Sequence, residues 1–286
     1  MITIYLQGGL GNQLFQIFTC ISYALRYNFE FKLPLYNQNE KIAKSPGGCL
    51  RPTYWDNLLV NLKNHVLDNN LLYKKLLEGK HSRLPQLREK DFHYNEIPKI
   101  NENFMLFGYF QSYKYFQDNL DKILEIIKIE SFKKTIHEKN KELFVGNTIS
   151  MHFRLGDYKN LSAHNIMPIN YYIDALSEII KKTEKDNFTV IFFCEDGDIE
   201  DVKNKINKIN QTYTNCVFKR GKAEDWEELI LMSLCNHNII ANSSFSWWGA
   251  YLNKNPDKVV CRPKNWFSEN YSKNTSDLCP NNWIKI

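Results

Sequence analysis

The sequence predicts an α/β protein made of two Rossmann-like lobes. Short apolar runs that favour β-strands alternate with runs of helical spacing along the whole chain, a pattern typical of parallel sheets covered by helices on both faces. The alternation restarts near residue 147, so we expect an N-terminal lobe at 1–146, a C-terminal lobe at 147–286 and a ligand cleft between them. A chain of 286 residues with 43% hydrophobic and 24% charged residues can bury a core in each lobe.

The N-terminal lobe begins with a strand, a glycine-rich turn and a helix. Residues 2–6 favour a strand, and the glycines that follow allow a tight turn. Asn12 can cap a helix whose apolar positions follow helical spacing: Leu14, Phe15, Phe18, Ile21 and Leu25. The other elements expected in this lobe are a strand at 29–35, a long loop at 38–54, helical or mixed structure at 56–78, an irregular polar stretch at 79–101, a strand at 104–110 and a helix at 115–129.

The C-terminal lobe continues the alternation without an internal repeat. A charged stretch of helical pattern at 130–145 carries the chain between the lobes. The strands expected beyond it are 148–151, 189–193, 215–218, 238–241 and 258–261. The helices expected between and after them are 169–183, 199–209, 225–234 and 246–252.

Charge and cysteine usage limit the partners and the compartment. The net charge of +5 comes from lysines scattered among acids, which indicates a solvated surface and argues against a nucleic-acid partner. The 7 cysteines show no C-x-x-C spacing and several lie in apolar runs, so we expect buried free thiols in a reducing compartment. Because no run is long enough to span a membrane and no signal peptide is recognisable, the sequence predicts a cytoplasmic protein with at most peripheral membrane association.

The glycine loop near the start fits a dinucleotide site poorly. Gly9 and Gly11 match the opening of G-x-G-x-x-G, but Leu14 stands at the third position. The acid expected after the second strand is missing, since Glu30 lies near the start of that strand. A nicotinamide or flavin cofactor is therefore disfavoured. The glycines either form a simple turn or let a ligand or the facing lobe approach the backbone closely.

A second glycine-containing stretch follows the first strand of the C-terminal lobe. His152 and Arg154 point the same way because side chains alternate along a strand. Arginine offers a planar fork for phosphate oxygens, and α/β sheets bind ligands at strand ends. Asp157 can hold either side chain in place. The alternative is a purely structural Arg–Asp pair.

A third motif joins a buried strand to a helix. Asn242, Ser243 and Ser244 lead into that helix, whose N-terminal N–H groups can bind a phosphate. Either serine can equally be an ordinary N-cap. We expect at least one of Trp247 and Trp248, which follow on the helix, to lie in the core.

A fourth motif is acidic and also stands at the end of a strand. A carboxylate of Glu195 or Asp196 can accept from a pair of guanine N–H groups, and a solvated acidic turn is the competing interpretation. No Asp-x-Asp motif for a metal-bound nucleotide stands at a strand end, so the sequence indicates no metal site.

Together and in this order, these motifs resemble those of the bacterial and animal α-1,2-fucosyltransferases, family 11 of the inverting glycosyltransferases. The matching stretches are 8–16, 107–111, 152–158, 193–196 and 241–248, so the resemblance covers nearly the whole chain. It implies a GT-B-like glycosyltransferase architecture that uses GDP-fucose as donor, with neither a metal nor another cofactor. The C-terminal lobe would bind the GDP-sugar, and the N-terminal lobe would bind the acceptor.

The resemblance also implies roles for individual residues. Arg154 would bind the donor diphosphate, Asp196 would read guanine, and Asn12 would lie near the reacting centre. The catalytic residues expected on this basis are Arg154, His152, Asp157 and Asn12. The expected donor-binding residues are Gly9, Gly11, Arg154, Glu195, Asp196, Asn242, Ser243, Ser244 and Phe245.

The implied reaction moves L-fucose from GDP-fucose to the 2-hydroxyl of a galactose-containing glycan, with a terminal β-galactoside as the expected acceptor. The acceptor hydroxyl attacks from the face opposite the leaving GDP, which inverts the anomeric centre. A general base can assist this attack. His152, Asp157 and Glu195 are the candidates, and the sequence does not choose among them.

One position departs from the family pattern. The family usually has two adjacent arginines here, whereas this chain has Leu155 at the second position. On a strand the side chain of residue 155 faces away from that of Arg154, so phosphate binding need not suffer. Two alternatives stay open: a sugar-nucleotide-binding protein with impaired catalysis, and a transferase with another GDP-sugar or another linkage.

Overall fold

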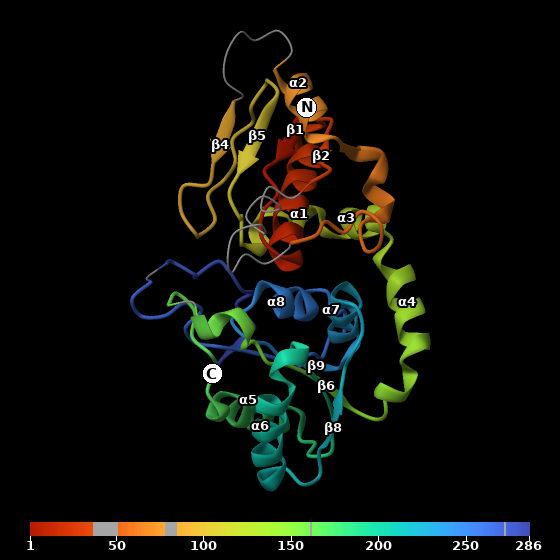
Figure 1. Cartoon of the computed structure of the whole chain (residues 1–286), viewed down its shortest axis with the longest axis vertical. Helices are drawn as coiled ribbons and strands as arrows, with labels where there is room; N and C mark the ends of the chain where they lie inside the picture. The colour runs from red at the N-terminus through yellow and green to blue at the C-terminus, as the bar shows by residue number, and fades with distance from the viewer. Residues whose placement is uncertain (37–50, 78–84, 161, 272) are drawn as a thin grey trace. The chain divides into compact units, whose positions relative to one another are not determined.

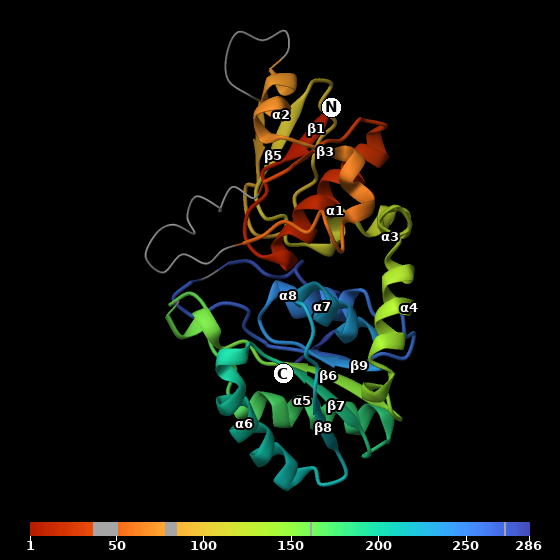
Figure 2. The ribbon, with the colours of Figure 1, turned by 45° about the vertical axis from the view of Figure 1, so that its right-hand side comes forward.

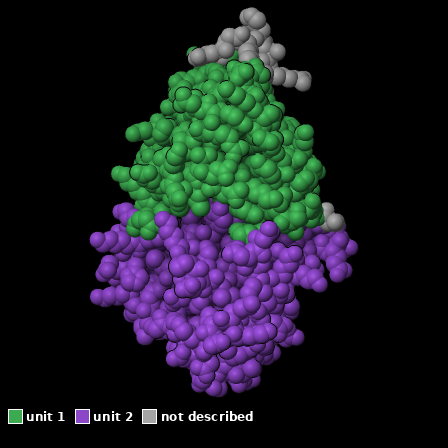
Figure 3. Space-filling model, turned by 180° about the vertical axis from the view of Figure 1, so that it is seen from behind, with its two compact units in different colours: residues 1–130, 273–280 green, residues 131–272, 281–286 purple. Residues whose placement is uncertain are grey.

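The computed structural model describes residues 1–36, 51–77, 85–160, 162–271 and 273–286. The chain forms two compact units, coloured separately in Figure 3. Unit 1 comprises Met1–Glu130 and Lys273–Pro280, and unit 2 comprises Ser131–Ser272 and Asn281–Ile286.

The division between the units differs from the expected boundary at residue 146. Helix α4 (Ile129–Lys139), expected to connect the lobes, packs within unit 2. The ammonium of Lys133 donates to the carbonyl oxygen of Leu252 at 2.6 Å, and the rings of Phe132 and Trp226 lie 5.6 Å apart. A late segment also returns to unit 1, where Asp277 forms an ion pair with Lys114. Contacts between distant segments therefore set the boundary.

Unit 1 contains a parallel sheet in the order β1-β5-β4 and a parallel pair β2-β3. The strands are β1 (Ile2–Ile4), β2 (Leu33–Pro34), β3 (Val66–Leu67), β4 (Gln86–Arg88) and β5 (Phe104–Phe107). The α-helices are α1 (Leu10–Tyr27), α2 (Asn69–Leu76) and α3 (Leu120–Ile127). Among the described residues of unit 1, the 3₁₀ turns are η2 (Val60–His65), η3 (Tyr113–Tyr115) and η4 (Gln117–Asn119).

Several expected boundaries in unit 1 are wrong for local reasons. The strand expected at 29–35 is reduced to β2 and a single bridge at Phe31. The strand expected at 104–110 ends at Phe107, because the backbone turns and Phe110 adopts a φ of 52°. The stretch expected to be irregular contains β4, and the helix expected at 115–129 begins only at α3 after two 3₁₀ turns. Most of the loop expected at 38–54 lies outside the described residues.

Unit 2 is a six-stranded parallel sheet in the order β11-β10-β9-β6-β7-β8. The strands are β6 (Thr148–His152), β7 (Thr189–Phe193), β8 (Val217–Arg220), β9 (His237–Ile239), β10 (Val260–Arg262) and β11 (Ile284–Lys285). When the strands of unit 2 are numbered 1 to 6 along the chain, their order across the sheet from β8 to β11 is 3-2-1-4-5-6. This is the order of Rossmann folds that bind dinucleotides. The expected fold class, α/β with Rossmann-like lobes, is confirmed.

Helices cover both faces of this sheet, as Figures 1 and 2 show, with α5 and α6 on one face and α7 and α8 on the other. Their bounds are α5 (Ile169–Thr183), α6 (Ile199–Thr212), α7 (Asp225–Leu234) and α8 (Ser244–Tyr251). The expected helices at 169–183 and 225–234 and the expected strand at 189–193 match at both ends. Short 3₁₀ turns are η5 (Lys141–Leu143), η6 (Gly156–Asn160) and η7 (Asp196–Asp198).

Burial agrees with the expected core. Trp247 and Trp248 in α8 are both fully buried, so both are core residues. Five cysteines in the described ranges are free and buried, as expected: Cys20, Cys194, Cys216, Cys235 and Cys261. Cys279 is also buried, and Cys49 lies outside the described ranges. None of the described helices is long and apolar enough to cross a membrane.

Candidate active site

Two of the sequence motifs meet at the centre of the unit 2 sheet. β6 and β9 are neighbours there, and the chain proceeds from β6 towards β7 but from β9 towards β10. Open α/β sheets bind their ligands beyond the carboxyl ends of the strands at such a switch point. The phenol of Tyr158, after β6, donates to the carbonyl oxygen of Asn242, after β9, at 2.9 Å. The rings of His152 and Phe245 lie 5.6 Å apart. The structure thus joins two predicted motifs about 90 residues apart at the edge where a ligand is expected.

Arg154 occupies this edge in an ion pair with Glu195, which follows β7. Its guanidinium carbon also lies 5.2 Å from the ring centre of Tyr158. The carboxylate is 53% exposed and the arginine side chain 19%, so Glu195 can move away more easily than Arg154. The sequence offered Asp157 as the partner of Arg154, but the side chain of Asp157 lies outside the described part of the structure. A phosphate can replace the Glu195 carboxylate, because both present oxygens to the same fork.

His152 is buried, and its environment disfavours a charged imidazole. Burial, and to a smaller extent the nearby Arg154 guanidinium, lowers the pKa of His152 to about 3. Nδ1 has no hydrogen-bond partner in the described part of the chain. A neutral imidazole with so low a pKa is a weak base. The low pKa disfavours His152 as a general base, and any other role for it toward a ligand stays a prediction.

The low pKa of His152 predicts a loss of stability in acid. An ordinary imidazole of the unfolded chain binds a proton below about pH 6.5, whereas folded His152 binds one only near pH 3, so protonation favours unfolding as the pH falls through this window. We expect His152→Gln to make the free energy of unfolding less dependent on pH between 6.5 and 4. Denaturant titrations at several pH values measure this slope. An unchanged slope would contradict the burial of a neutral His152.

The turn after Arg154 is held by Asp198, a residue that the sequence analysis missed. Asp198 is 4% exposed and accepts from the backbone N–H of Gly156 at 2.6 Å and from the ammonium of Lys159 at 2.9 Å. Gly156 has a φ of 23°, and a Cβ there would lie 2.5 Å from a carboxylate oxygen of Glu195. The glycine therefore makes room for Glu195 next to Arg154. Only the position of Asp198 just before α6 hinted at a capping or anchoring role.

Asp196 is held by two cations that the sequence analysis also missed. Arg220 at the end of β8 pairs with one carboxylate oxygen, and Lys222 donates to the other at 3.1 Å. These hydrogen bonds, that of Arg220 first, lower the pKa of Asp196. The carboxylate thus stays ionised, the form that accepts from guanine N–H groups. Neither cation belongs to a recognisable motif, since only the pairing of β7 with β8 brings them near Asp196.

The start of α8 presents backbone donors on the same edge. Ser243 is the N-cap residue, but its side chain accepts no hydrogen bond from the helix, so the ordinary N-cap interpretation is wrong for Ser243. At the other end of α8, Lys133 donates to Leu252 and Lys258 donates to Ala250 at 2.8 Å. Cations at a helix C-terminus complement its dipole, as an anion does at the N-terminus. The region of Ser244 and Phe245 is therefore suited to a phosphate.

Asn242 acts as an anchor for the loops at this edge. Its side-chain amide donates to the carbonyl oxygens of Asn165 at 3.0 Å and Trp266 at 3.1 Å. The side chain is buried, with the whole residue 1% exposed. Contact with a ligand through this side chain would require the loops to open. The predicted contact of Asn242 with the donor stays a prediction, and in the structure its side chain anchors these loops.

The glycine loop of unit 1 is fixed by amide side chains. Gly8 has a φ of 79° and Gly9 is the N-cap of α1, so Asn12 lies inside the first turn and is not the cap, which corrects the expectation. The oxygen of the Asn12 amide accepts from the Gln111 amide at 2.6 Å. Gln13 donates to the carbonyl oxygen of Gly8 at 3.0 Å. The proposed roles of Gly9, Gly11 and Asn12 toward a ligand remain predictions, and these residues form a group within unit 1.

Glu89 stands beside this group and was not singled out from the sequence. Its two carboxylate oxygens accept from the backbone N–H groups of Tyr109 at 2.8 Å and Phe110 at 2.9 Å. A Cβ at Gly108 would lie 2.4 Å from the Cβ of Glu89, so only glycine fits there. Burial raises the pKa of Glu89 to about 7 despite these two donors. Glu89 holds the turn that presents Gln111 to Asn12.

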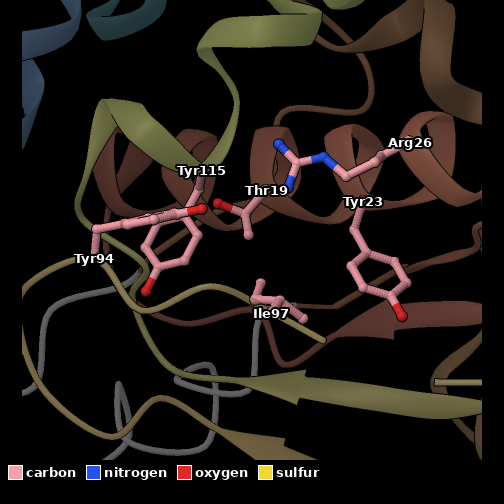
Figure 4. Close-up of a pocket in the computed structure, with 6 residues that line it drawn as sticks. All are labelled: Thr19, Tyr23, Arg26, Tyr94, Ile97 and Tyr115. Atoms are coloured by element: carbon pink, nitrogen blue, oxygen red, sulfur yellow. The ribbon is translucent and has the colours of Figure 1, made fainter. Parts of the chain in front are cut away.

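A separate pocket in unit 1 is lined by residues of α1 and by the segments that cover it: Thr19, Tyr23, Arg26, Tyr94, Ile97 and Tyr115 (Figure 4). Thr19 lies seven residues beyond Asn12 on α1, a separation of about 10 Å along the helix axis. The pocket is therefore distinct from the glycine loop. Across the described ranges, no group of three or more histidine, cysteine, aspartate or glutamate side chains is arranged to hold a metal ion.

The class of protein that fits this fold and site is the nucleotide-binding proteins with a Rossmann-type sheet. Residues 1–286 match the profile of Glycosyl transferase family 11, and the chain belongs to that family. It is 29% identical over 296 residues to an alpha-1,2-colitosyltransferase of Escherichia coli, covering 100% of this chain and 99% of that protein. It is 31% identical over 223 residues to the O-antigen biosynthesis glycosyltransferase WbnK of Escherichia coli, covering 72% of this chain and 68% of that protein.

Among solved structures, the Escherichia coli ADP-heptose lps heptosyltransferase II aligns with a TM-score of 0.49 at 12% identity. The alignment covers 100% of this chain and 89% of that protein. The fold assignment rests on the strand order of unit 2, which is that of a Rossmann fold. The family assignment rests on the profile match over the whole chain.

Proposed function

We propose that this family 11 glycosyltransferase moves L-fucose from GDP-fucose to the 2-hydroxyl of a terminal β-galactoside, with inversion and without a metal ion. The observation that carries this proposal is that the motif containing Arg154 meets the segment that starts α8 at the switch point of unit 2, through the contacts of Tyr158 with Asn242 and of His152 with Phe245. We further propose that the protein works in the cytoplasm, with at most peripheral membrane association, because the thiols of Cys20, Cys194, Cys216, Cys235 and Cys261 are free and buried.

The transfer reaction requires that negative charge is stabilised where GDP departs. As the bond to the sugar breaks, charge grows on the β-phosphate while the sugar becomes cationic, much as in glycoside hydrolysis. In our proposal Arg154 exchanges Glu195 for the diphosphate, and the N–H groups at the start of α8 add a second set of donors. One preorganised donor of this kind lowers the barrier by roughly 3–4 kcal/mol. Asp196, kept ionised by Arg220, would select guanine.

Of the candidates for a general base whose side chains the structure describes, Glu195 suits the role better than His152. His152 has too low a pKa. Glu195 is half exposed and lies directly beside Arg154, so binding of the donor diphosphate would free its carboxylate. The released carboxylate would then turn to the face opposite GDP and accept the proton of the hydroxyl that attacks there.

A second candidate is the transfer of another sugar. The relative named alpha-1,2-colitosyltransferase matches this chain from end to end, which favours an activated colitose as the alternative donor. A catalytically impaired binding protein is less well supported. Leu155, the departure from the family pattern that suggested it, is buried in the apolar cluster on the α5 side of the sheet and does not lie at the edge where a phosphate is expected.

The test is a donor and acceptor panel with the purified protein in the presence of a chelator. We expect release of GDP from GDP-fucose when a terminal β-galactoside is supplied, and a product whose new linkage is α-1,2 by NMR. Turnover only with activated colitose would select the second candidate. Donor binding without turnover of any sugar would support the binding protein, and turnover only after metal addition would overturn metal independence.

A further inference from the structure

Arg262 ends β10 and faces the same side of the unit 2 sheet as Arg154. Register places Met151 of β6, Ile239 of β9 and Cys261 of β10 in one row. The side chains of this row face α5, because all three residues belong to a hydrophobic core cluster that also contains residues of α5. The Cys261 thiol also contacts the carbonyl oxygen of Ala175 in α5 at 3.5 Å. Because side chains alternate, the next row faces α8.

That next row contains His152, Ile240 and Arg262. The contact of His152 with Phe245 of α8 confirms the direction in which the row faces. Neighbouring strands lie about 4.8 Å apart, so the backbones of His152 and Arg262 are separated by about 10 Å across β9. Arg154 lies on the same face, two residues beyond His152. The two arginines therefore lie on the two sides of the strand that leads into the start of α8.

Arg262 is buried without a counter-ion, unlike Arg154 and Arg220. The residue is 8% exposed, and its guanidinium makes one hydrogen bond, to the carbonyl oxygen of Pro263 at 3.3 Å. Its Nε has no partner among the described residues, and no ion pair with a described carboxylate involves it. Arg154 pairs with Glu195 and Arg220 pairs with Asp196. A buried, unpaired cation is costly, and an anion beside it removes that cost.

We propose that Arg262 is a second cationic contact for the diphosphate of the donor. This role rests on the proposed function, because it requires a nucleoside diphosphate at the switch point. A diphosphate presents two anionic groups, and Arg154 and Arg262 stand at the ends of the strands on either side of β9, the strand that leads into α8. The fork of Arg262 contacts phosphate oxygens and shares with Arg154 the charge that grows as GDP departs.

The experiment compares the binding of GDP and of guanosine by calorimetry to the wild-type protein and to Arg262→Met. Methionine fills similar space without a charge. We expect Arg262→Met to weaken GDP binding about tenfold or more and to leave guanosine binding unchanged. We expect no loss of thermal stability, since the substitution removes an unpaired buried cation. Arg262→Lys, which keeps the charge, should recover part of the GDP affinity and also serves if the methionine variant fails to fold.

The controls separate this role from the proposed function. Arg26→Met changes an arginine in unit 1 that pairs with Asp118, and it should bind GDP like the wild type. Unchanged GDP binding in both Arg262 variants would overturn the role of Arg262 alone. An equal loss of GDP and guanosine binding would also overturn it, because that pattern indicates a structural effect. If the wild-type protein binds none of GDP, UDP and ADP, the proposed function fails and this role fails with it.

Discussion

Replacing Arg154 by alanine is expected to lower turnover about 100- to 1,000-fold and to leave the fold intact. The size of this loss follows from removing one preorganised hydrogen-bond donor at the departing phosphate, which lowers the barrier by roughly 3–4 kcal/mol. The fold should persist because the partner of Arg154 is Glu195, whose side chain is 53% exposed. Removing one member of so exposed a pair costs at most about 1 kcal/mol of stability. The measurement is release of GDP from the donor, together with thermal unfolding of the same sample.

A matched substitution shows whether the loss is specific. Arg26 also forms a partly exposed ion pair, with Asp118 of unit 1, so Arg26→Ala should change stability by a similar small amount without changing turnover. Near-normal turnover of Arg154→Ala would remove Arg154 from the mechanism. A loss of turnover accompanied by unfolding would instead show a structural role for the pair with Glu195.

Replacing Leu155 by arginine is expected to destabilise the protein by about 3 kcal/mol or more, because it leaves an uncompensated charge in an apolar interior. Leu155 is 5% exposed and belongs to the cluster of Phe153, Met167 and Tyr172 on the α5 side of the sheet. The substitution would restore the two adjacent arginines that the resemblance leads one to expect, but on the face opposite Arg154. Denaturant unfolding gives the change in the free energy of unfolding.

Two controls bracket this effect. Leu155→Met keeps the volume and the apolar character, and should cost less than about 1.5 kcal/mol. Leu71→Arg places the same charge at a leucine that is 46% exposed in α2, and should change stability by no more than about 0.5 kcal/mol. If Leu155→Arg proved as stable as the wild type and faster in turnover, residue 155 would have to face the phosphate edge.

Hydrophobic periodicity predicted the strongly patterned segments well and the weakly patterned ones poorly. Helices α5 and α7 and strand β7 were predicted with their ends, because each buries one apolar face or both. Strand β4 was missed, since its residues Gln86 and Arg88 are exposed and its pairing with β5 supplies the only signal. Strand β11 has two residues, too few for any period to show.

The residues of the candidate site also divide into those that a local sequence pattern marks and those that it does not. Arg154, Glu195, Asp196 and Ser244 were singled out because each follows an apolar run, and strand ends are visible in a sequence; their roles toward a ligand stay predictions. Asp198, Arg220 and Glu89 were not recognised, because their partners lie on segments 20 or more residues away. Nothing local marks such a residue as different from a solvated charge.

By itself, the sequence determined the α/β class, the glycosyltransferase family and the strand ends where the predicted ligand-binding motifs stand, because these depend on local spacing and residue type. The tertiary structure alone decided that Arg154 meets Glu195, that Leu155 belongs to the core and that Arg262 shares a face with Arg154. The physical reason is that strand register and side-chain alternation select which distant residues become neighbours, and only the assembled sheet sets that register.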